Sequence, residues 1–172
     1  MNIRPLQRWE LSYITEIDVS EEGDRIYRNV EGRLVAEAES WHRPHWDVEE
    51  CQRRIAGFTA ELDRGDAVLG AFDGDRLVGV ASLRYRLTAD MAQLVSLHIS
   101  QSYRRRGVAT ALTDEIFRLA KASGAYRIYV SATPSGSALG FYRHKGFELA
   151  EQVNEELFAL EPEDIHMIKE LA

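Results

Sequence analysis

A run of basic residues between an apolar segment and a helix-like segment has the chemistry to bind an anionic group. The run and the residues after it read Arg104-Arg105-Arg106-Gly107-Val108-Ala109-Thr110. A helix that begins here presents backbone N–H groups without partners inside the helix, and its dipole adds partial positive charge. Gly107 and Ala109 carry little or no side chain, so that a ligand can approach the backbone closely. The segment therefore predicts a pyrophosphate-binding site.

The same residues also fit a solvated basic turn in front of a surface helix, and the arginines alone do not decide between these interpretations. The spacing does argue against two other kinds of phosphate loop. No Lys-Ser or Lys-Thr pair follows Gly107, as a Walker-type nucleotide loop requires. No Gly-x-Gly-x-x-Gly pattern occurs near the N-terminus, where a Rossmann dinucleotide site would have it.

Two segments resemble the motifs of the GNAT superfamily of acetyl-coenzyme A-dependent N-acetyltransferases. Arg104-x-x-Gly107-x-Ala109 is similar to the family's Gln/Arg-x-x-Gly-x-Gly/Ala signature. The second segment, Ser135-x-x-Ala138-x-x-x-Tyr142-x-x-x-Gly146-Phe147, resembles Asn-x-x-Ala-x-x-x-Tyr-x-x-x-Gly-Phe, with Ser135 in place of Asn. The order of elements from residue 67 onward, and the first strand and helix, also fit the family.

The resemblance implies that acetyl-coenzyme A is the co-substrate. Leu97-His98-Ile99 resembles the family's fourth strand, whose backbone binds the pantetheine arm. The cofactor-binding residues that the resemblance implies are Leu97, His98, Ile99, Arg104, Arg105, Arg106, Gly107, Val108, Ala109, Thr110, Ser135, Ala138 and Tyr142.

Acetyl transfer needs a neutral amine, a donor to the oxyanion and a proton for the departing thiolate. In the family a tyrosine on the helix after the fifth strand supplies that proton, and Tyr142 is the matching residue. The alternative for Tyr142 is a packed aromatic beside Phe141. The resemblance implies direct attack by a primary amine of a small molecule or peptide in a ternary complex, with Tyr142 as general acid.

The general base stays open. Some members of the family carry Glu at the fourth-strand position that corresponds to Gln93 here, and an amide does not accept a proton at neutral pH. The candidates are a chain of water molecules or one of the side chains Glu16, Asp18, Glu21, Asp90 and His98. Each carboxylate also fits a solvated surface group, and His98 also fits a core histidine.

Residues 41–46 read Trp-His-Arg-Pro-His-Trp and are expected to form a loop. The family builds its acceptor pocket between the first two helices, so the resemblance implies that Trp41 and Trp46, with Gln93, contact the acceptor. Aromatic faces can stack on a ring or a cation. A packed aromatic loop is one alternative, and a zinc site at the two histidines is another. No third ligand has suitable spacing, so no metal is expected, and Cys51 is interpreted as structural.

The elements that position these residues alternate between strand-like and helix-like patterns. Strands are predicted over residues 2–6, 67–72, 77–87, 91–99, 126–131, 147–153 and 165–171, and helices over 7–17, 47–62, 107–122 and 134–144. Asp47 is a predicted N-cap and Gly124 a predicted helix end. A hairpin with Glu31-Gly32 in its turn is predicted over 25–40. The expected fold is α/β: one mixed-sheet GNAT-like domain over 1–172, with central strands flanked by helices and the hairpin inserted between the first two helices.

Composition narrows the function classes further. The 172 residues are 45% hydrophobic and 28% charged, which suits a chain with a real core and argues against disorder. A single cysteine excludes an internal disulfide, and no apolar run is long enough to span a bilayer. Without a signal-peptide core at the N-terminus, a cytoplasmic location is expected, with no membrane partner. The net charge of -7 disfavours nucleic acid as a partner and slightly favours a cationic acceptor.

Three functions remain open at this point. The first is an enzyme that acetylates an amine, acting as a monomer or a homodimer. The second is a non-catalytic module of the same fold that binds or senses an acyl-coenzyme A, which the substitutions at Ser135 and Gln93 keep open. The third is a structural dimer subunit whose hairpin supplies the contact surface.

Overall fold

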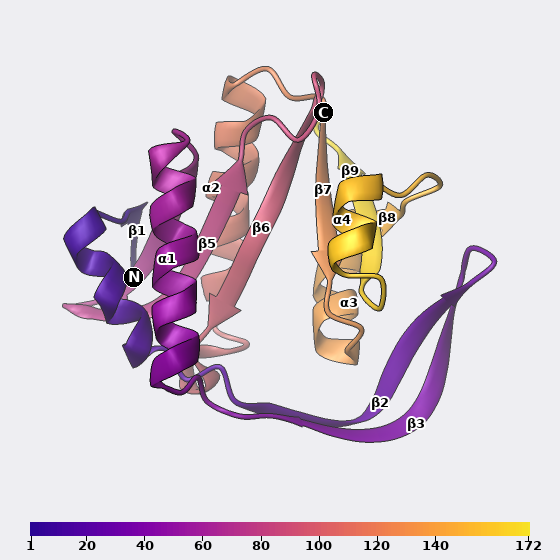
Figure 1. Ribbon diagram of the computed structural model, residues 1–172, viewed down its shortest axis with the longest axis horizontal. Helices are drawn as coiled ribbons and strands as arrows, with labels where there is room; N and C mark the ends of the chain where they lie inside the picture. The colour runs from indigo at the N-terminus through magenta and orange to yellow at the C-terminus, as the bar shows by residue number, and fades with distance from the viewer.

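The computed structural model describes residues 1–172, and a seven-stranded sheet lies at its centre (Figure 1). The strand order is β1-β4-β5-β6-β7-β9-β8. The strands are β1 (Asn2–Pro5), β4 (Ala67–Asp73), β5 (Arg76–Arg84), β6 (Met91–Ile99), β7 (Arg127–Ala132), β8 (Glu148–Leu149) and β9 (Ile165–Glu170). All neighbours in the sheet are antiparallel except β6 and β7, which are parallel.

The parallel pair opens part-way along its length. β6 and β7 are paired from Met91 and Arg127 as far as Leu94 and Val130, and no pairing follows. Figure 1 shows the two strands diverging beyond this point. A strand that loses its neighbour exposes backbone N–H and C=O groups. The second half of β6 therefore offers a free edge in the middle of the sheet.

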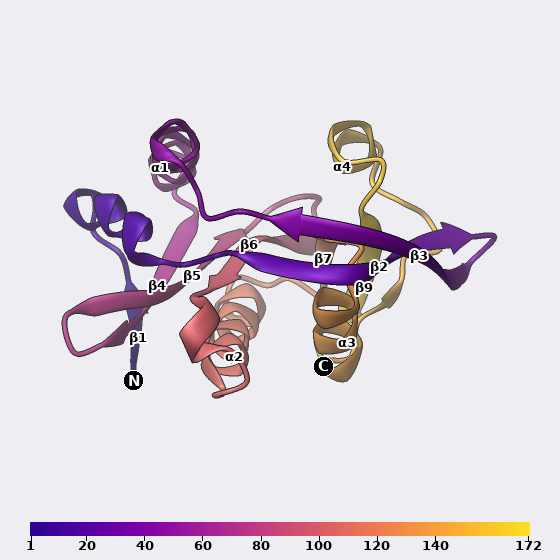
Figure 2. The same cartoon turned by 90° about the horizontal axis from the view of Figure 1, so that it is seen from below.

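Helices cover both faces of the sheet. Figure 2 shows α1 (Val48–Asp63) and α4 (Glu155–Leu160) on one face, and α2 (Val108–Ala122) and α3 (Gly136–His144) on the other. In α2 the buried residues Val108, Leu112, Ile116 and Ala120 recur every four positions, which places them on one helix face against the sheet. Asp47 caps α1, since its side chain accepts a hydrogen bond from the backbone of Glu50.

The first helical segment differs from the predicted α-helix. Residues Arg8–Glu16 form a 3₁₀ helix, η1. Its buried apolar residues explain the difference, because Leu11 and Ile14, and then the adjacent Ile17, are spaced by three. A helix with three residues per turn places such residues on one face, where they join the core formed with α1, β4 and β5. The prediction of an ordinary helix over 7–17 was therefore wrong in type.

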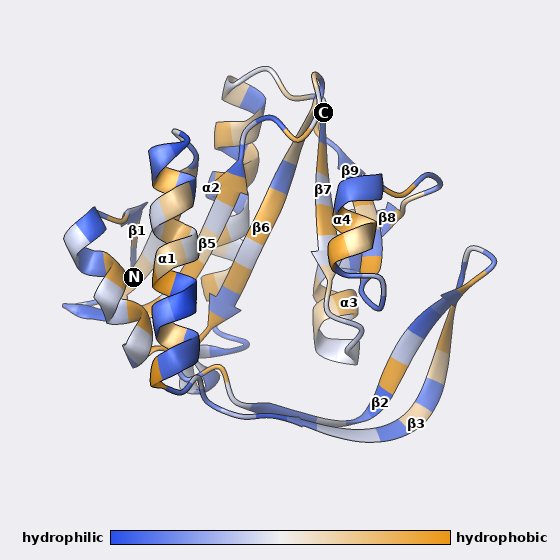
Figure 3. Ribbon diagram, viewed as in Figure 1, coloured by the Kyte–Doolittle hydropathy of each residue, from blue (hydrophilic) through white to orange (hydrophobic).

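A long hairpin separate from the main sheet lies between η1 and α1. Its strands are β2 (Glu21–Val30) and β3 (Arg33–Arg43), and it is longer than the predicted 25–40. Glu31 and Gly32 have φ of 53° and 81°, as a two-residue turn between twisted strands favours. Figure 1 shows the hairpin crossing below the end of the sheet, and Figure 3 shows it as a mixture of hydrophilic and hydrophobic segments.

The C-terminal part also departs from the predicted elements. The strand expected over 147–153 is reduced to β8, and no helix was predicted where α4 lies. The side chain of Asn154 caps α4 by accepting a hydrogen bond from the backbone N–H of Leu157. Helix α3 is capped by Ser135, so Pro134 lies outside the helix. A short 3₁₀ turn, η2 (Gln101–Tyr103), precedes α2. None of the helices combines the length and the apolar composition needed to cross a membrane.

Candidate active site

The open ends of β6 and β7 lead into a cavity of about 720 Å³. It is lined by β6, the turn before α2, α3, the start of the hairpin and the segment before β9. Twelve of the thirteen residues that the motifs implied for cofactor binding line it: Leu97, His98, Ile99, Arg104, Arg105, Gly107, Val108, Ala109, Thr110, Ser135, Ala138 and Tyr142. The fold thus brings both motif segments to one cavity.

The N-terminus of α2 is built to accept a ligand. Gly107 precedes the helix with φ of 82°, and no side chain caps the helix. The backbone N–H groups of Val108, Ala109 and Thr110 donate no hydrogen bond within the protein. Added to the helix dipole, these free donors match an anionic group such as a pyrophosphate.

The three arginines of the turn have different roles. Arg104 donates hydrogen bonds from Nε to the carbonyl of Ile99 at 3.2 Å and from Nη1 to that of Ser20 at 3.0 Å, so its guanidinium holds the turn in place. Arg106 lies over the ring of Tyr103, 4.9 Å from its centre, and does not line the cavity, unlike the two arginines before it. Arg105 is exposed and lines the cavity without an ion-pair partner, so it is free to meet an anion.

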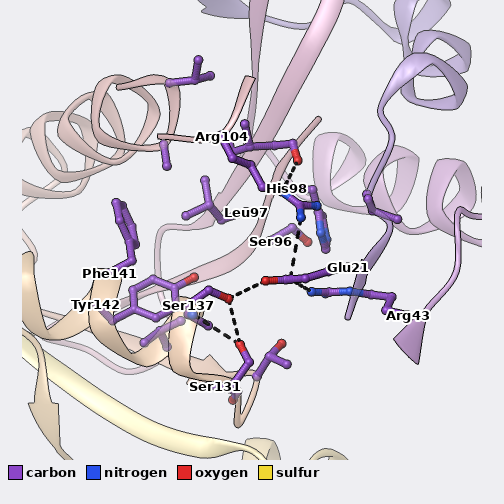
Figure 4. A pocket seen from close by; sticks show the side chains of 18 of the residues that line it. Glu21, Arg43, Ser96, Leu97, His98, Arg104, Ser131, Ser137, Phe141 and Tyr142 are labelled. Carbon is purple, nitrogen blue, oxygen red and sulfur yellow. Dashed lines mark hydrogen bonds and ion pairs between the residues drawn. The ribbon is translucent and has the colours of Figure 1, made fainter. Parts of the chain in front are cut away.

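Tyr142 lies on α3 with its ring in the core and its hydroxyl toward the cavity (Figure 4). The ring packs between Phe141 and Phe147, with centroid distances of 5.5 and 5.4 Å. The hydroxyl forms no hydrogen bond within the protein, although it is not shut off from solvent. Burial, and then the charge of Asp164, raise the pKa of the Tyr142 phenol. The phenol therefore keeps its proton at neutral pH, as a general acid must.

Of the five side chains considered for the base, only Glu21 and His98 line the cavity. His98 accepts a hydrogen bond at Nε2 from Arg54 at 3.3 Å, since a guanidinium can only donate. Burial, and then the charges of Arg54, Arg43 and Arg104, lower the pKa of His98 to about 3. The lone pair of Nε2 is occupied and the basicity of the ring is low, so these contacts do not favour His98 as the base.

Glu21 begins the hairpin and is held by three side chains. It forms an ion pair with Arg43, accepts a hydrogen bond from Ser137 at 2.6 Å, and lies 4.0 Å from Arg104 (Figure 4). These contacts tie the hairpin to α3 and to the turn before α2. The buried Nε of Arg43 has no hydrogen-bond partner. Glu21 is thus a positioned, charge-compensated carboxylate.

Two further carboxyl groups line the cavity that the sequence analysis missed. Glu161 directly follows α4 as its C-cap, and Asp164 lies just before β9. Neither forms an ion pair, unlike Glu21. Burial, and then a hydrogen bond and the charge of Glu161, raise the pKa of Asp164 to about 8. In the sequence they belong to the acidic stretch Glu161-Pro162-Glu163-Asp164, which resembles a solvated loop, so no local signal identified them.

Residues 25–147 match the sequence model of a protein family described as "Acetyltransferase (GNAT) family". The chain belongs to this family. It is 26% identical over 113 residues to the probable N-acetyltransferase san of Drosophila melanogaster, a match that covers 63% of this chain and 61% of that protein. The chain thus spans about three fifths of the length of this curated relative. Family membership makes this a GNAT acetyltransferase domain.

Solved structures show the same fold. A nourseothricin acetyltransferase superimposes with a TM-score of 0.76 at 17% identity, covering 99% of this chain and 98% of that one. The PaiA N-acetyltransferase of Thermoplasma acidophilum, in complex with coenzyme A, gives 0.65 at 18% identity, covering 98% of both chains. A GNAT family acetyltransferase of Elizabethkingia anophelis, with acetyl-CoA bound, gives 0.54 at 14% identity over 66% of this chain and 82% of that one.

The other three candidate bases of this GNAT domain serve the structure elsewhere. Glu16 accepts a hydrogen bond from the backbone of Leu77 at 2.9 Å. Asp18 accepts two from Ser20, which lower its pKa. Asp90 is bound by Thr88 and Arg127 at the closed end of β6 and β7. None of these three carboxylates lines the cavity, so the structure does not place them where a base would act.

The residues expected to contact the acceptor also lie outside the cavity lining. Gln93 is buried where β6 still pairs with both β5 and β7, ahead of the point at which the sheet opens. Trp41 belongs to β3 rather than to a loop, and its Nε1 donates to the carbonyl of Arg25 at 2.8 Å. Trp46 is 8% exposed within the core beside α1, edge-on to His98. The packing interpretation therefore describes the tryptophans better than acceptor contact.

A Trp46→Ala variant should lose stability without a selective effect on one substrate. Removing a buried tryptophan leaves a cavity and costs about 3–5 kcal/mol. Thermal unfolding measured beside both Michaelis constants checks this, with Trp9→Ala as control because Trp9 is 68% exposed. A normal melting temperature with a raised acceptor constant alone would restore the acceptor-contact interpretation.

Proposed function

We propose that this protein transfers the acetyl group of acetyl-coenzyme A to a primary amine of a cationic small molecule or peptide. The observation that carries the proposal is the separation of charge within one cavity. On the β6 side, the free N–H groups of α2 and Arg105 attract an anion. On the far side of β7, ahead of β9, Glu161 and Asp164 line the same cavity without a cationic partner. Tyr142 lines the same cavity.

Backbone groups without hydrogen-bond partners support the binding of acetyl-coenzyme A in this cavity. The helix N-terminus would hold the pyrophosphate, and the unpaired half of β6 would hydrogen-bond the pantetheine arm. The arm would then run along Leu97, His98 and Ile99 toward the end of the cavity where Tyr142 lies. When bound, acetyl-coenzyme A supplies the thioester whose carbonyl carbon is attacked.

The chemistry of the chain's own residues follows from this arrangement. The neutral amine attacks the carbonyl carbon, and collapse of the oxyanion breaks the carbon–sulfur bond. The sulfur leaves with the electron pair and takes the proton of the Tyr142 hydroxyl, which is free of other hydrogen bonds. A hydroxyl poised in this way favours an enzyme over a module that only binds acyl-coenzyme A.

The acceptor end favours a cation for an electrostatic reason. Carboxyl groups in a partly buried site without compensation cost free energy, and an ammonium supplies the missing charge. The nourseothricin acetyltransferase that shares the fold is named after a small-molecule acceptor, which supports an acceptor of that kind here. A peptide that presents a primary amine satisfies the same chemistry.

A thiol-release assay with acetyl-coenzyme A and matched amines tests this function. We expect an alkyl diamine to give a higher kcat/KM than the monoamine of equal length, and the advantage to shrink as salt is added, because salt screens the attraction. Calorimetry with acetyl-coenzyme A runs in parallel. Tight binding without thiol release for any amine would identify a sensing module and reject the enzyme.

We further propose that residues 1–172 act as one N-acetyltransferase domain. The sheet takes strands from both ends of the chain, since β1 pairs with β4 and β9 pairs with β7. Limited proteolysis checks this, and two separately stable fragments would contradict it.

A further inference from the structure

We propose that Asp164, acting with Glu161, takes the proton of the acceptor's ammonium group. The inference rests on the proposed function and names the base that the family motifs leave open. Both side chains line the cavity that holds Tyr142, and both come from the segment between α4 and β9.

A buried network fixes the segment that carries the two carboxyl groups. The carbonyl of Glu161 accepts a hydrogen bond from Nε2 of His166 at 2.9 Å. The other ring nitrogen, Nδ1, then carries no proton. It accepts a hydrogen bond from the Tyr129 hydroxyl at 2.7 Å. The Tyr129 oxygen accepts in turn from the backbone of Asn154, the cap of α4, at 3.1 Å. The turn before β9 is thus anchored at both ends, which positions its carboxyl groups.

The charges around Asp164 leave room for a cation. Asp164 meets Glu161 from the same segment and the neutral phenol of Tyr142 from α3, while on β9 the ring of His166 is occupied by its own two hydrogen bonds. Arg28 of β2 is the cation on the hairpin side, and it is bound to Glu37 and Glu163. No cation of the protein therefore compensates the pair.

The pair has the chemistry of two carboxyl groups that share a proton. Like charges disfavour double ionisation, so that one group holds its proton above the usual range. This agrees with the raised pKa of Asp164. An ammonium that binds beside the pair favours its ionised form, and a carboxylate with a raised pKa is a better proton acceptor than an ordinary one.

The proton transfers then balance. The Asp164 carboxylate removes one proton from the ammonium and passes it to solvent, which leaves a neutral amine. The amine nitrogen forms the bond to the carbonyl carbon, and the carbon–sulfur bond breaks as Tyr142 protonates the sulfur. The nitrogen loses its second proton, which returns to the Tyr142 oxygen. The products are the amide, the free thiol and one proton in solution.

An Asp164→Asn variant tests the proposal with two acceptors. With an alkyl diamine at pH 7.5 we expect kcat/KM to fall by about 10²–10⁴, since that is the usual contribution of a general base. An arylamine is already neutral at this pH, so its rate should change little. Glu163→Gln is the matched control, because the neighbouring Glu163 pairs with Arg28 outside this cavity. Equal losses for both acceptors, or none for either, would overturn the role of Asp164.

The pH profile separates the enzyme's base from the acceptor's own titration. Asp164 must be ionised to accept a proton, so kcat/KM should rise with pH along a limb whose midpoint lies near pH 8. The midpoint of this limb should not move when an acceptor of different pKa is used. The limb should disappear in Asp164→Asn. A limb that follows the acceptor, in both proteins alike, would contradict the proposal.

A stability measurement provides a readout that does not need activity. Asp164 in the native protein keeps its proton up to pH about 8, whereas an ordinary aspartate in the unfolded chain loses it at about pH 4. The native state binds more protons in this window, so stability should fall as pH rises from 4 to 8. Asp164→Asn should lack that part of the fall. A wild type that acetylates no amine would reject the proposed function, whereas an active Asp164→Asn rejects only the base.

Discussion

A Tyr142→Phe variant should turn over about 10²–10⁴ times more slowly than the parent while it binds acetyl-coenzyme A equally well. The change removes one hydroxyl and keeps the ring, which packs between Phe141 and Phe147. The fold should therefore stay intact. The hydroxyl forms no other hydrogen bond in the protein, so its loss affects only the proton delivered to the leaving sulfur.

Steady-state kinetics with calorimetry for the cofactor measures this effect. Tyr126→Phe is the matched control, because Tyr126 is 71% exposed and lies outside the cavity lining. A Tyr142→Phe rate within about twofold of the parent would mean that water or another group protonates the thiolate, since a general acid contributes far more than that.

A Gly107→Asp variant should lose measurable binding of acetyl-coenzyme A. At φ of 82° a residue with a side chain costs about 1–2 kcal/mol, which a folded domain can tolerate. A Cβ at this position meets no protein atom within 4 Å, so the new carboxylate would extend into open space in front of α2. There it would repel the phosphates and bind the free N–H groups itself.

The other end of α2 supplies the control for Gly107→Asp. Gly124 also has a positive φ, 95°, and a Cβ there would also meet no protein atom within 4 Å, so Gly124→Asp reproduces the backbone strain away from the cavity. Circular dichroism should show both variants folded, and calorimetry should show binding lost only in Gly107→Asp. Unchanged affinity in that variant would reject the pyrophosphate site.

The site at the start of α2 could be predicted because its signals are local. A basic turn, a glycine and the start of a helical pattern lie within a few residues, and the sequence displays all of them, whereas the positive φ of the glycine comes from the structure. The cap at Asp47 and the turn at Glu31-Gly32 are equally local. The spacing of Tyr142 within its motif likewise placed it on a helix that reaches the same cavity.

The roles of Arg104 and Trp46 depend on partners that lie far away in the sequence. Arg104 is bound to the carbonyl of Ser20, and Trp46 is packed against His98, across sequence distances that no local pattern reports. The 3₁₀ form of η1 likewise came from packing, since spacing by three becomes decisive only once those side chains meet a core.

The sequence by itself determined the family motifs, the helix end that was expected to bind a phosphate and the general-acid candidate, because each depends on residues close together in the chain. Only the tertiary structure decided which carboxyl groups line the cavity without a cationic partner. Asp164 and Glu161 lie more than a hundred residues from Glu21, and their charges differ in effect because Arg43 compensates Glu21 and no cation compensates the pair. Burial and uncompensated charge arise from neighbours that the fold supplies, so they have no local sequence pattern.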